Sequence, residues 1–310
     1  MPSREHPQYP DYLIARREDL ELVPTPETEL SFVVPNAVNP YREALLAGGI
    51  SNTDPATVEK KEVAVDLARM LEDAIPLHRS AGREDWARAL EAIRGDIRMT
   101  PEKRRILEQE IADGAIVIPM PGRDTQLATT SEQYQTTFTP IWIKDSTVQP
   151  QGDAYLWDYI KELIDNRDPS LIAGIPERPY VMLIKPTQAP EARTCKKTVD
   201  QQKAEVVKMN QERTTQGQAP VASAKPAEFG VVQQFFTHSV QAEAPGGTLT
   251  TLQPLDSVTY SRFIDLPVSA VGSVPSGCFG LGSRRLGFGE GGARWADPGG
   301  GVRLLVRVEI

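Results

Sequence analysis

The side chains that most often carry catalysis or bind metals are few in this chain of 310 residues, and they lie far apart. Its three histidines are His6, His78 and His238, and its two cysteines are Cys195 and Cys278. Zinc sites and His-based catalytic sites need ligands at short, recognisable spacings, and a disulfide framework needs more cysteines. The sequence therefore predicts ordinary histidines, two unpaired thiols and no metal site.

The common catalytic motifs are also missing from the sequence. It contains no Gly-x-Ser-x-Gly, no His-Glu-x-x-His and no P-loop. Residues 280–287, Gly-Leu-Gly-Ser-Arg-Arg-Leu-Gly, have the glycine spacing of a phosphate cradle, but they lack the Lys-Ser/Thr ending of that motif. We therefore expect a protein that is not an enzyme and that has no cofactor.

The positive signal lies near the end of the chain. Ten of the 23 glycines fall between Gly277 and Gly301, and residues 277–310 carry five arginines against three acids. Large apolar, aromatic and arginine side chains alternate with these glycines: Phe279, Leu281, Arg284, Arg285, Phe288, Arg294 and Trp295. Aromatic and arginine side chains are the usual anchors of binding surfaces. We expect glycine-rich turns that hold these side chains toward a ligand; the alternative is that the aromatic ones belong to the core.

Overall charge and hydropathy limit the partners. The net charge is −8, with 42 acidic and 34 basic residues, which disfavours a nucleic-acid partner because phosphate binding needs clustered Lys and Arg. No stretch approaches the roughly 20 apolar residues that cross a bilayer. Residues 1–19 have charges and prolines where a signal peptide needs an apolar core. The sequence predicts a cytoplasmic or virion-associated protein.

The first part of the chain reads as an arm followed by helices. Residues 1–55 are rich in Pro, Asn and Thr, as in an arm that could wrap a neighbouring subunit of a homo-oligomer. Apolar residues at helical spacing predict helices over 57–74, 83–93 and 100–113. In the last of these, Thr100 is the expected N-cap and Pro101 the first helical residue. We expect a mainly helical domain over residues 1–176.

The sequence pattern changes from helical spacing to β-branched and aromatic residues from Ala115 on. Short strands are predicted over 115–119 and 137–143, and a helix over 155–164. A cluster of turn residues at 176–178 predicts the domain boundary. Beyond it we expect a strand over 180–184, helices over 198–212 and 224–236, and a closing strand over 302–308. The predicted fold class is α+β, with a second domain over 177–310.

The second domain resembles the C-type-lectin fold in its formylglycine-generating-enzyme-like form. In that fold a strand precedes two helices, a long loop-rich stretch and a closing strand. The second helix often opens with a Leu-Pro-Thr-x-x-Glu-Trp motif, to which Ala224-Lys-Pro-Ala-Glu-Phe229 is similar. The closing strand often reads Gly-Phe/Val-Arg followed by apolar residues, as does the sequence from Gly301. The resemblance covers roughly 130 residues by loose motifs.

The tail is also similar to the variable proteins of diversity-generating retroelements, which rewrite adenines in a C-terminal repeat. Such rewriting of an Asn codon yields Phe, Leu, Ser, Arg, Gly, Ala or Asp, and residues 277–303 consist largely of these types and contain no Lys, Gln or Met. The exceptions, Glu290 and Trp295, would be fixed scaffold positions. The residues implied to face ligand are Phe279, Leu281, Ser283, Arg284, Arg285, Phe288, Arg294 and Asp297. Trp295 joins the predicted binding set on its own chemistry.

Three function classes follow. The first is a binding protein that recognises a protein or cell-surface ligand through this tail. The second is a structural or virion-assembly component whose tail only packs. The third is a formylglycine-generating-type oxidase, which the sequence disfavours because such enzymes use two nearby cysteines and this tail has only Cys278.

Overall fold

The fold is built on a sheet whose central pair of strands comes from distant parts of the chain. The structure, a computed structural model, describes strands at 4–6 and 9–14 and residues 67–138, 152–185, 187, 189–238, 256, 259–280 and 285–310. The described helices are α2 (Leu67–Ser80), α3 (Glu84–Ala92), α4 (Pro101–Ala112), α5 (Arg123–Leu127), α6 (Ser131–Thr137), α7 (Asp158–Asp165), α8 (Val199–Thr215) and α9 (Pro226–His238), with 3-10 turns η2 (Pro169–Leu171) and η3 (Ala192–Thr194).

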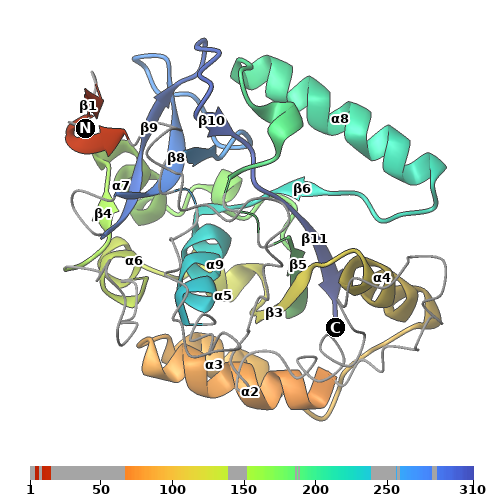
Figure 1. Cartoon of the computed structure of the whole chain (residues 1–310). Helices are drawn as coiled ribbons and strands as arrows, with labels where there is room; N and C mark the ends of the chain where they lie inside the picture. The colour runs from red at the N-terminus through yellow and green to blue at the C-terminus, as the bar shows by residue number, and fades with distance from the viewer. Residues whose placement is uncertain are drawn as a thin grey trace, which may run out of the picture.

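The described strands form three sheets. The strands are β1 (Arg4–His6), β2 (Tyr9–Ile14), β3 (Ile116–Met120), β4 (Tyr155–Leu156), β5 (Tyr180–Ile184), β6 (Ala222–Ser223), β7 (Tyr260–Arg262), β8 (Ser273–Gly280), β9 (Arg285–Gly292), β10 (Gly300–Gly301) and β11 (Leu304–Glu309). Strands β1 and β2 pair with each other, the central sheet has the order β3-β5-β11-β6, and the second sheet has the order β10-β7-β8-β9-β4. The chain is thus a mixed α+β protein (Figure 1).

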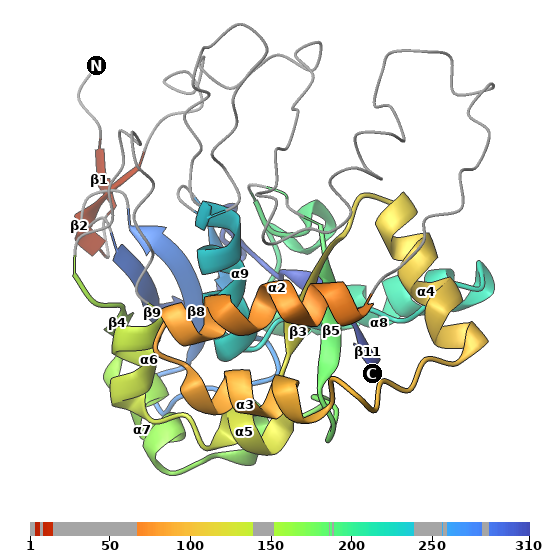
Figure 2. The ribbon, with the colours of Figure 1, turned by 90° about the horizontal axis from the view of Figure 1, so that it is seen from below.

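The central sheet is covered on both faces. Side chains alternate along a strand, so Val181 and Leu183 of β5 pack with α2, α3 and α4, whereas Met182 and Ile184 pack with α9 and the second sheet. All five residues of β5 are buried, which explains why its sequence is apolar without alternation. Figure 2 shows α2 and α3 side by side across one side of this sheet. The sheet is therefore the middle layer between two cores.

The predicted domain boundary does not separate two cores in the described residues. Strand β3, which precedes the boundary at 176–178, pairs with β5, which follows it, from Ile116 opposite Ile184 to Met120 opposite Tyr180. Both hydrophobic clusters draw residues from each side of the boundary. The division into 1–176 and 177–310 followed turn composition, which does not reveal that an early strand joins a later sheet.

Most helices lie where hydrophobic spacing placed them, and the α+β class is confirmed. Helix α4 begins as expected, with the Thr100 hydroxyl accepting the N–H of Lys103, and Thr198 opens α8 with a capping box. The strand expected over 137–143 is wrong at its start, because Thr137 ends helix α6; residues 139–143 lie outside the described residues, as does the start of the helix expected at 57. Within the described residues no helix is long and apolar enough to cross a membrane.

Candidate functional site

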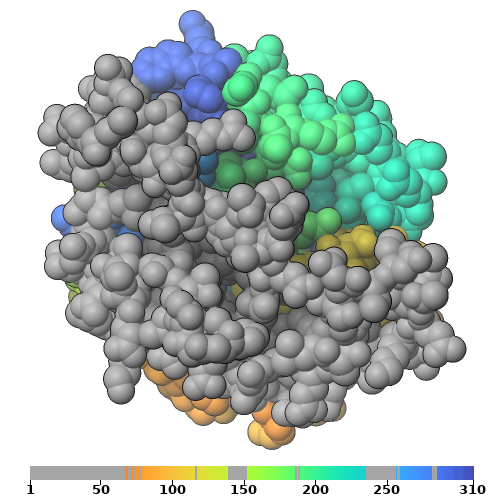
Figure 3. Space-filling model, viewed as in Figure 1, coloured from red at the N-terminus to blue at the C-terminus, as the bar shows by residue number. Residues whose placement is uncertain are grey.

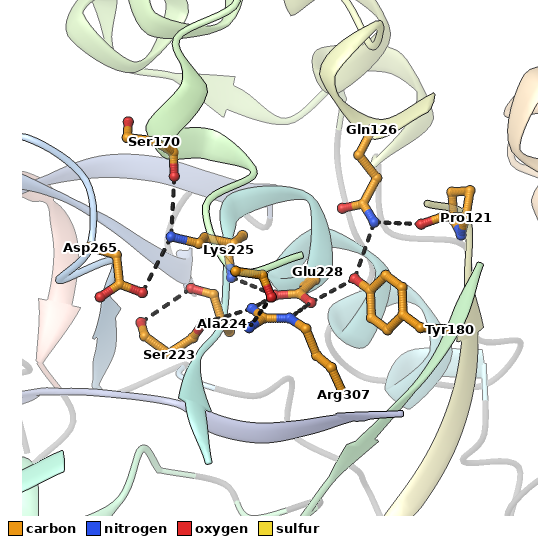
Figure 4. Close-up of polar contacts among 11 residues, drawn as sticks. Pro121, Gln126, Ser170, Tyr180, Ser223, Ala224, Lys225, Glu228, Asp265 and Arg307 are labelled. Atoms are coloured by element: carbon orange, nitrogen blue, oxygen red, sulfur yellow. Dashed lines mark hydrogen bonds and ion pairs between the residues drawn. The ribbon is translucent and has the colours of Figure 1, made fainter. Parts of the chain in front are cut away.

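A buried polar cluster joins β11 to helix α9 (Figure 4). Arg307 of β11 donates from Nε to Oε1 of Glu228 at 2.6 Å and from Nη2 to Oε2 at 2.7 Å. The Tyr180 hydroxyl donates to Oε1 at 2.6 Å, and the backbone N–H of Lys225 donates to Oε2 at 2.8 Å. Burial raises the pKa of Glu228, but Arg307 and these hydrogen bonds outweigh it, so the pKa lies below its ordinary value.

The hydrogen-bonded cluster extends beyond this pair to Gln126 and Lys225. Gln126 donates from Nε2 to the Tyr180 hydroxyl at 3.1 Å and to the Pro121 carbonyl at 2.8 Å. Buried Lys225 donates from Nζ to the Ser170 carbonyl at 3.1 Å and to Oδ2 of Asp265 at 3.2 Å. Each charged group of the cluster thus has a protein partner. Its chemistry is that of a buried clamp, which holds β11, β5 and α9 together beneath the second sheet.

Two of the predicted binding residues face the interior, which corrects the sequence-based set. Phe279 is 1% exposed and Phe288 is fully buried. The Phe288 ring packs edge-on against the rings of Tyr134 and Phe229, with centroids 6.0 and 6.3 Å away. Successive side chains of a strand point to opposite faces, and β8 and β9 turn these phenylalanines inward. Neither can contribute to a ligand-binding surface.

The glycines of the tail serve packing more than turning, which is a second correction. Most of those described lie inside β8, β9 and β10, and none of the described glycines between 277 and 301 has a positive φ. A Cβ on Gly277 would lie 2.5 Å from the Phe229 ring and 2.9 Å from the Phe263 ring. A Cβ on Gly300 would lie 2.7 Å from the Tyr260 ring. The glycine density reflects aromatic rings that lie directly on strand backbone.

The exposed members of the predicted set divide between the two ends of β9. Arg285, the first residue of β9, is exposed, and Tyr155 of the neighbouring strand β4 is 47% exposed opposite Gly287. Arg294 and Trp295 follow the other end, about 25 Å away along eight strand residues. The other predicted residues of the hairpin tip, Leu281, Ser283 and Arg284, lie outside the described residues.

The segment 293–299, between β9 and β10, carries the clearest exposed anchor; we call it the 293–299 loop. Trp295 is 51% exposed and Arg294 is exposed, whereas Asp297 is half-buried. The Asp297 carboxylate accepts the backbone N–H of Gly299 at 2.7 Å, so it shapes the loop. In Figure 3 the blue C-terminal residues stand out at the top of the molecule, next to the green residues that precede α8.

The loop is fastened from behind by a buried arginine of β7. Arg262 is 1% exposed, and its Nη2 donates to the Trp295 carbonyl at 2.9 Å and to the Tyr260 hydroxyl at 3.1 Å. Its Nη1 donates to the Lys197 carbonyl at 2.9 Å. The backbone N–H of Lys196 in turn donates to the Asp297 carbonyl at 3.2 Å. Arg262 therefore ties two surface segments, 195–197 and 293–299, to the second sheet.

The sequence reasoning missed Arg262, Lys196 and Tyr155. The one available signal was the arginine in the apolar run Tyr260-Ser-Arg-Phe-Ile264, where a charged residue facing the interior needs a specific partner. Nothing in the sequence placed Lys196 beside the 293–299 loop, because the two segments are brought together only by the sheet and η3. Tyr155 was read as the start of a helix, but it lies in β4.

Metal-binding and thiol chemistry find no support in the described part of the chain. There, no three His, Cys, Asp or Glu side chains are grouped so that they could hold a metal ion. Burial raises the pKa of the Cys195 thiol, and Asp256 raises it further, so that thiol is poorly ionised. Neither Cys195 nor Cys278 forms a disulfide bond among the described residues.

The chain matches no protein-family model, no curated protein and no solved structure.

Proposed function

We propose that this chain is a non-enzymatic binding protein that recognises a protein or cell-surface ligand through the 293–299 loop on a C-type-lectin-like scaffold. One observation carries the proposal. Trp295 exposes half of its surface although Arg262 fixes its backbone carbonyl. A large side chain that is open to solvent on a firmly held backbone is typical of an interface anchor, since little backbone entropy is lost when a partner covers it.

The order of elements supports the scaffold. Strand β5 is followed by helices α8 and α9, then by the second sheet and finally by β11, which is the order that the resemblance implies. Strands β5 and β11 are antiparallel partners from Tyr180 opposite Glu309 to Ile184 opposite Leu305. The motif at 224–229 supplies Glu228, the buried partner of Arg307 in the closing strand. The two stretches that carry the resemblance thus meet in one clamp.

In this arrangement, the residues that stabilise the fold are different from the residues that face a ligand. The clamp, the central sheet and the buried phenylalanines of the hairpin hold the fold together, whereas Arg294 has no ion pair with any described residue. Exposed residues without such contacts usually change stability by less than about 0.5 kcal/mol when they are replaced. This separation is what a diversified surface requires.

We also propose that the tail is a variable region of a diversity-generating retroelement, with a smaller set of displayed positions. Of the predicted positions, Arg285, Arg294 and Asp297 are not buried and stay in the displayed set. Leu281, Ser283 and Arg284 also stay in the set as predictions, and they lie outside the described residues. Phe279 and Phe288 move to the fixed scaffold because they are buried, and Glu290 stays there. Genomic sequence tests this proposal. A near-copy of the 3′ end of the gene, differing at adenines and lying beside a reverse transcriptase, is the expected result.

Binding itself is tested by selection. Immobilised full-length chain is used to select binders from a displayed library of cell-surface ectodomains, and each binder is measured again on R294A and W295A variants. We expect both variants to weaken binding at least tenfold. Val207→Ala, at a residue 57% exposed on α8, is the matched control and should change nothing. Binders that hold R294A and W295A as tightly as the original chain would contradict the proposal and favour the structural, assembly-type function.

A further inference from the structure

We infer that the 293–299 loop binds a compact anion attached to a flat ring, such as a phosphate or carboxylate on an aromatic group. The inference rests on the proposed function, because it names the ligand chemistry of the same surface. It follows from three features of the described residues: an open aromatic face, two cations without acid partners, and a rigid backing.

The first feature is the orientation of the Trp295 indole. A Cβ built on Gly292 would lie 2.6 Å from Cδ2 of that ring, 2.9 Å from Cε3 and 3.0 Å from Cγ. Cε3 and Cγ are both bonded to Cδ2, so a point nearest to Cδ2 and slightly farther from both neighbours lies above the ring face. In the ring plane, the same point would be closer to Cγ than to Cδ2. The indole therefore rests face-down on the strand.

The opposite face of the indole is consequently the one left to solvent. Trp295 is 51% exposed although one ring face is covered by Gly292. Aromatic rings stack readily on such a face, at offset geometry, and bring energy beyond the area that they bury. Gly292 is what permits this arrangement, since any Cβ there would enter the ring.

The second feature is the charge beside the ring. The segments 293–299 and 195–197 carry Arg294, Lys196 and Lys197 against a single acid, Asp297. Lys197 pairs with Glu205 at 3.2 Å, and Asp297 accepts the Gly299 N–H at 2.7 Å. Arg294 and Lys196 are exposed and form no ion pair with an acid among the described residues. A pair of exposed cations with no acid of its own complements an anion.

The third feature is the buried charge of Arg262. It contacts the carbonyl oxygens of Lys197 and Trp295 and the hydroxyl of Tyr260, and no carboxylate of the described residues pairs with it. Its Nε is buried without a hydrogen-bond partner. A buried cation of this kind is costly, and its positive charge lies directly behind the two surface segments that its hydrogen bonds hold. Arg262 thus both orders the loop and favours an anion on it.

The size of the ligand follows from the same residues. Arg294 and Lys196, which have no acid partner among the described residues, and one ring face match a single anionic group with one ring. A polyanion such as nucleic acid would need many more cations, and the chain as a whole carries a net charge of −8.

The test uses the full chain and four Trp indole N–H signals in nitrogen-correlated proton spectra, with the Trp295 signal identified by its loss in W295F. The probes are adenosine monophosphate and hippurate as ring-bearing anions, adenosine and benzamide as neutral rings, and phosphate and acetate as anions without a ring. The two ring-bearing probes distinguish a phosphate from a carboxylate source. We expect ring-bearing anions to shift the Trp295 signal at concentrations at least tenfold lower than the other four.

Charge variants complete the test. R294A and K196A should each weaken the ring-bearing anion severalfold, whereas K203A, at an exposed lysine of α8, should leave it unchanged. Equal shifts from neutral rings, no shift at Trp295, or an equal loss in K203A would overturn the inference. Its failure is separable from failure of the proposed function. If ring-bearing anions do not bind but W295A still weakens binding of the selected ectodomains, the ligand class is wrong and the proposed function stands. If ring-bearing anions bind but no selected ectodomain depends on Trp295, the surface binds anions and does not recognise macromolecules.

Discussion

Arg307 holds both carboxylate oxygens of Glu228, at 2.6 and 2.7 Å, in a place where the carboxylate is fully enclosed by protein. The pair joins the last strand of the chain to a helix that lies well before it in sequence. Glu228 also accepts hydrogen bonds from Tyr180 and from the backbone of Lys225, so the carboxylate is saturated. Such a pair fixes one arrangement of strand and helix, because any displaced partner would leave a buried charge alone.

Arg307→Met is therefore expected to lower the free energy of unfolding by about 3–5 kcal/mol, since it leaves the Glu228 charge buried without its cation. Urea unfolding at neutral pH measures the change. The matched control is Arg94→Met, which removes an exposed ion pair with Glu72 and should cost less than about 1 kcal/mol. Adding Glu228→Gln to Arg307→Met should restore part of the loss. Equal losses in the two single variants would show that the clamp is no stronger than a surface pair.

Acid sensitivity is expected from His78. Burial and the charge of Arg83 lower the pKa of His78 to about 3, while Arg83 Nε donates to its Nδ1 at 3.1 Å. Between pH 6.5 and about 3 the unfolded chain therefore binds a proton that the folded chain refuses, so stability rises with pH across this window and is lost as pH falls. From pH 7.5 to pH 5 the loss should be about 2 kcal/mol.

Unfolding free energies of the original chain and of His78→Gln, each at both pH values, isolate this effect. The variant is less stable at neutral pH but should lack the His78 share of the acid loss, while carboxylates act alike in both chains. If the two chains lose the same amount on acidification, another group is responsible.

Two glycines of the β8–β9 hairpin provide a matched pair. A Cβ at Gly277 would enter the rings of Phe229 and Phe263, whereas a Cβ at Gly289 meets nothing within 4 Å. Gly277→Ala should destabilise the fold by about 1–3 kcal/mol. Gly289→Ala should be neutral or stabilise by up to about 1 kcal/mol, because alanine restricts the unfolded chain. Thermal unfolding separates the two, and a similar loss at both sites would mean that the glycines serve backbone freedom and not ring packing.

The fastening of the 293–299 loop is tested by proteolysis. Arg262→Met removes the hydrogen bonds to the carbonyl oxygens of Trp295 and Lys197, so trypsin should cut after Arg294 and Lys196 several times faster than in the original chain. Cleavage after Arg104, exposed on α4, is the internal control. Acceleration confined to the first two sites is the expected result. Equal acceleration at Arg104 would mean that the whole fold is loosened.

Local features of this fold were readable from the sequence, and its long-range pairing was not. Thr100 and Thr198 marked helix starts because capping is a contact between residues three apart. The apolar run of β5 likewise indicated a buried strand. The partnership of β3 with β5 escaped prediction because no local pattern tells a strand which of several later strands it will join.

The candidate site was predicted only in part for a similar reason. Arg294 and Trp295 are exposed, as the binding interpretation needs. Phe279 and Phe288, which were assigned to the same set, are buried, as in the alternative that the aromatic side chains belong to the core. Glycine-rich sequence carries no clear alternation, so the face of each side chain could not be read. The role of Arg262 could not be predicted, because it depends on the carbonyl oxygens of Lys197 and Trp295, which belong to two segments far from β7 in the sequence.

The pairing of β5 with β11 has a consequence for synthesis. On a ribosome, β5 emerges long before β11. Strand β5 therefore stays unpaired on one edge until β11 is translated after the β8–β9 hairpin. A stop codon or frameshift within the hairpin removes β11 and Arg307 together, leaving two apolar faces and the Glu228 carboxylate uncovered. Cellular proteases act on such unfolded chains. Only chains that are translated in frame through the hairpin can therefore complete the central sheet.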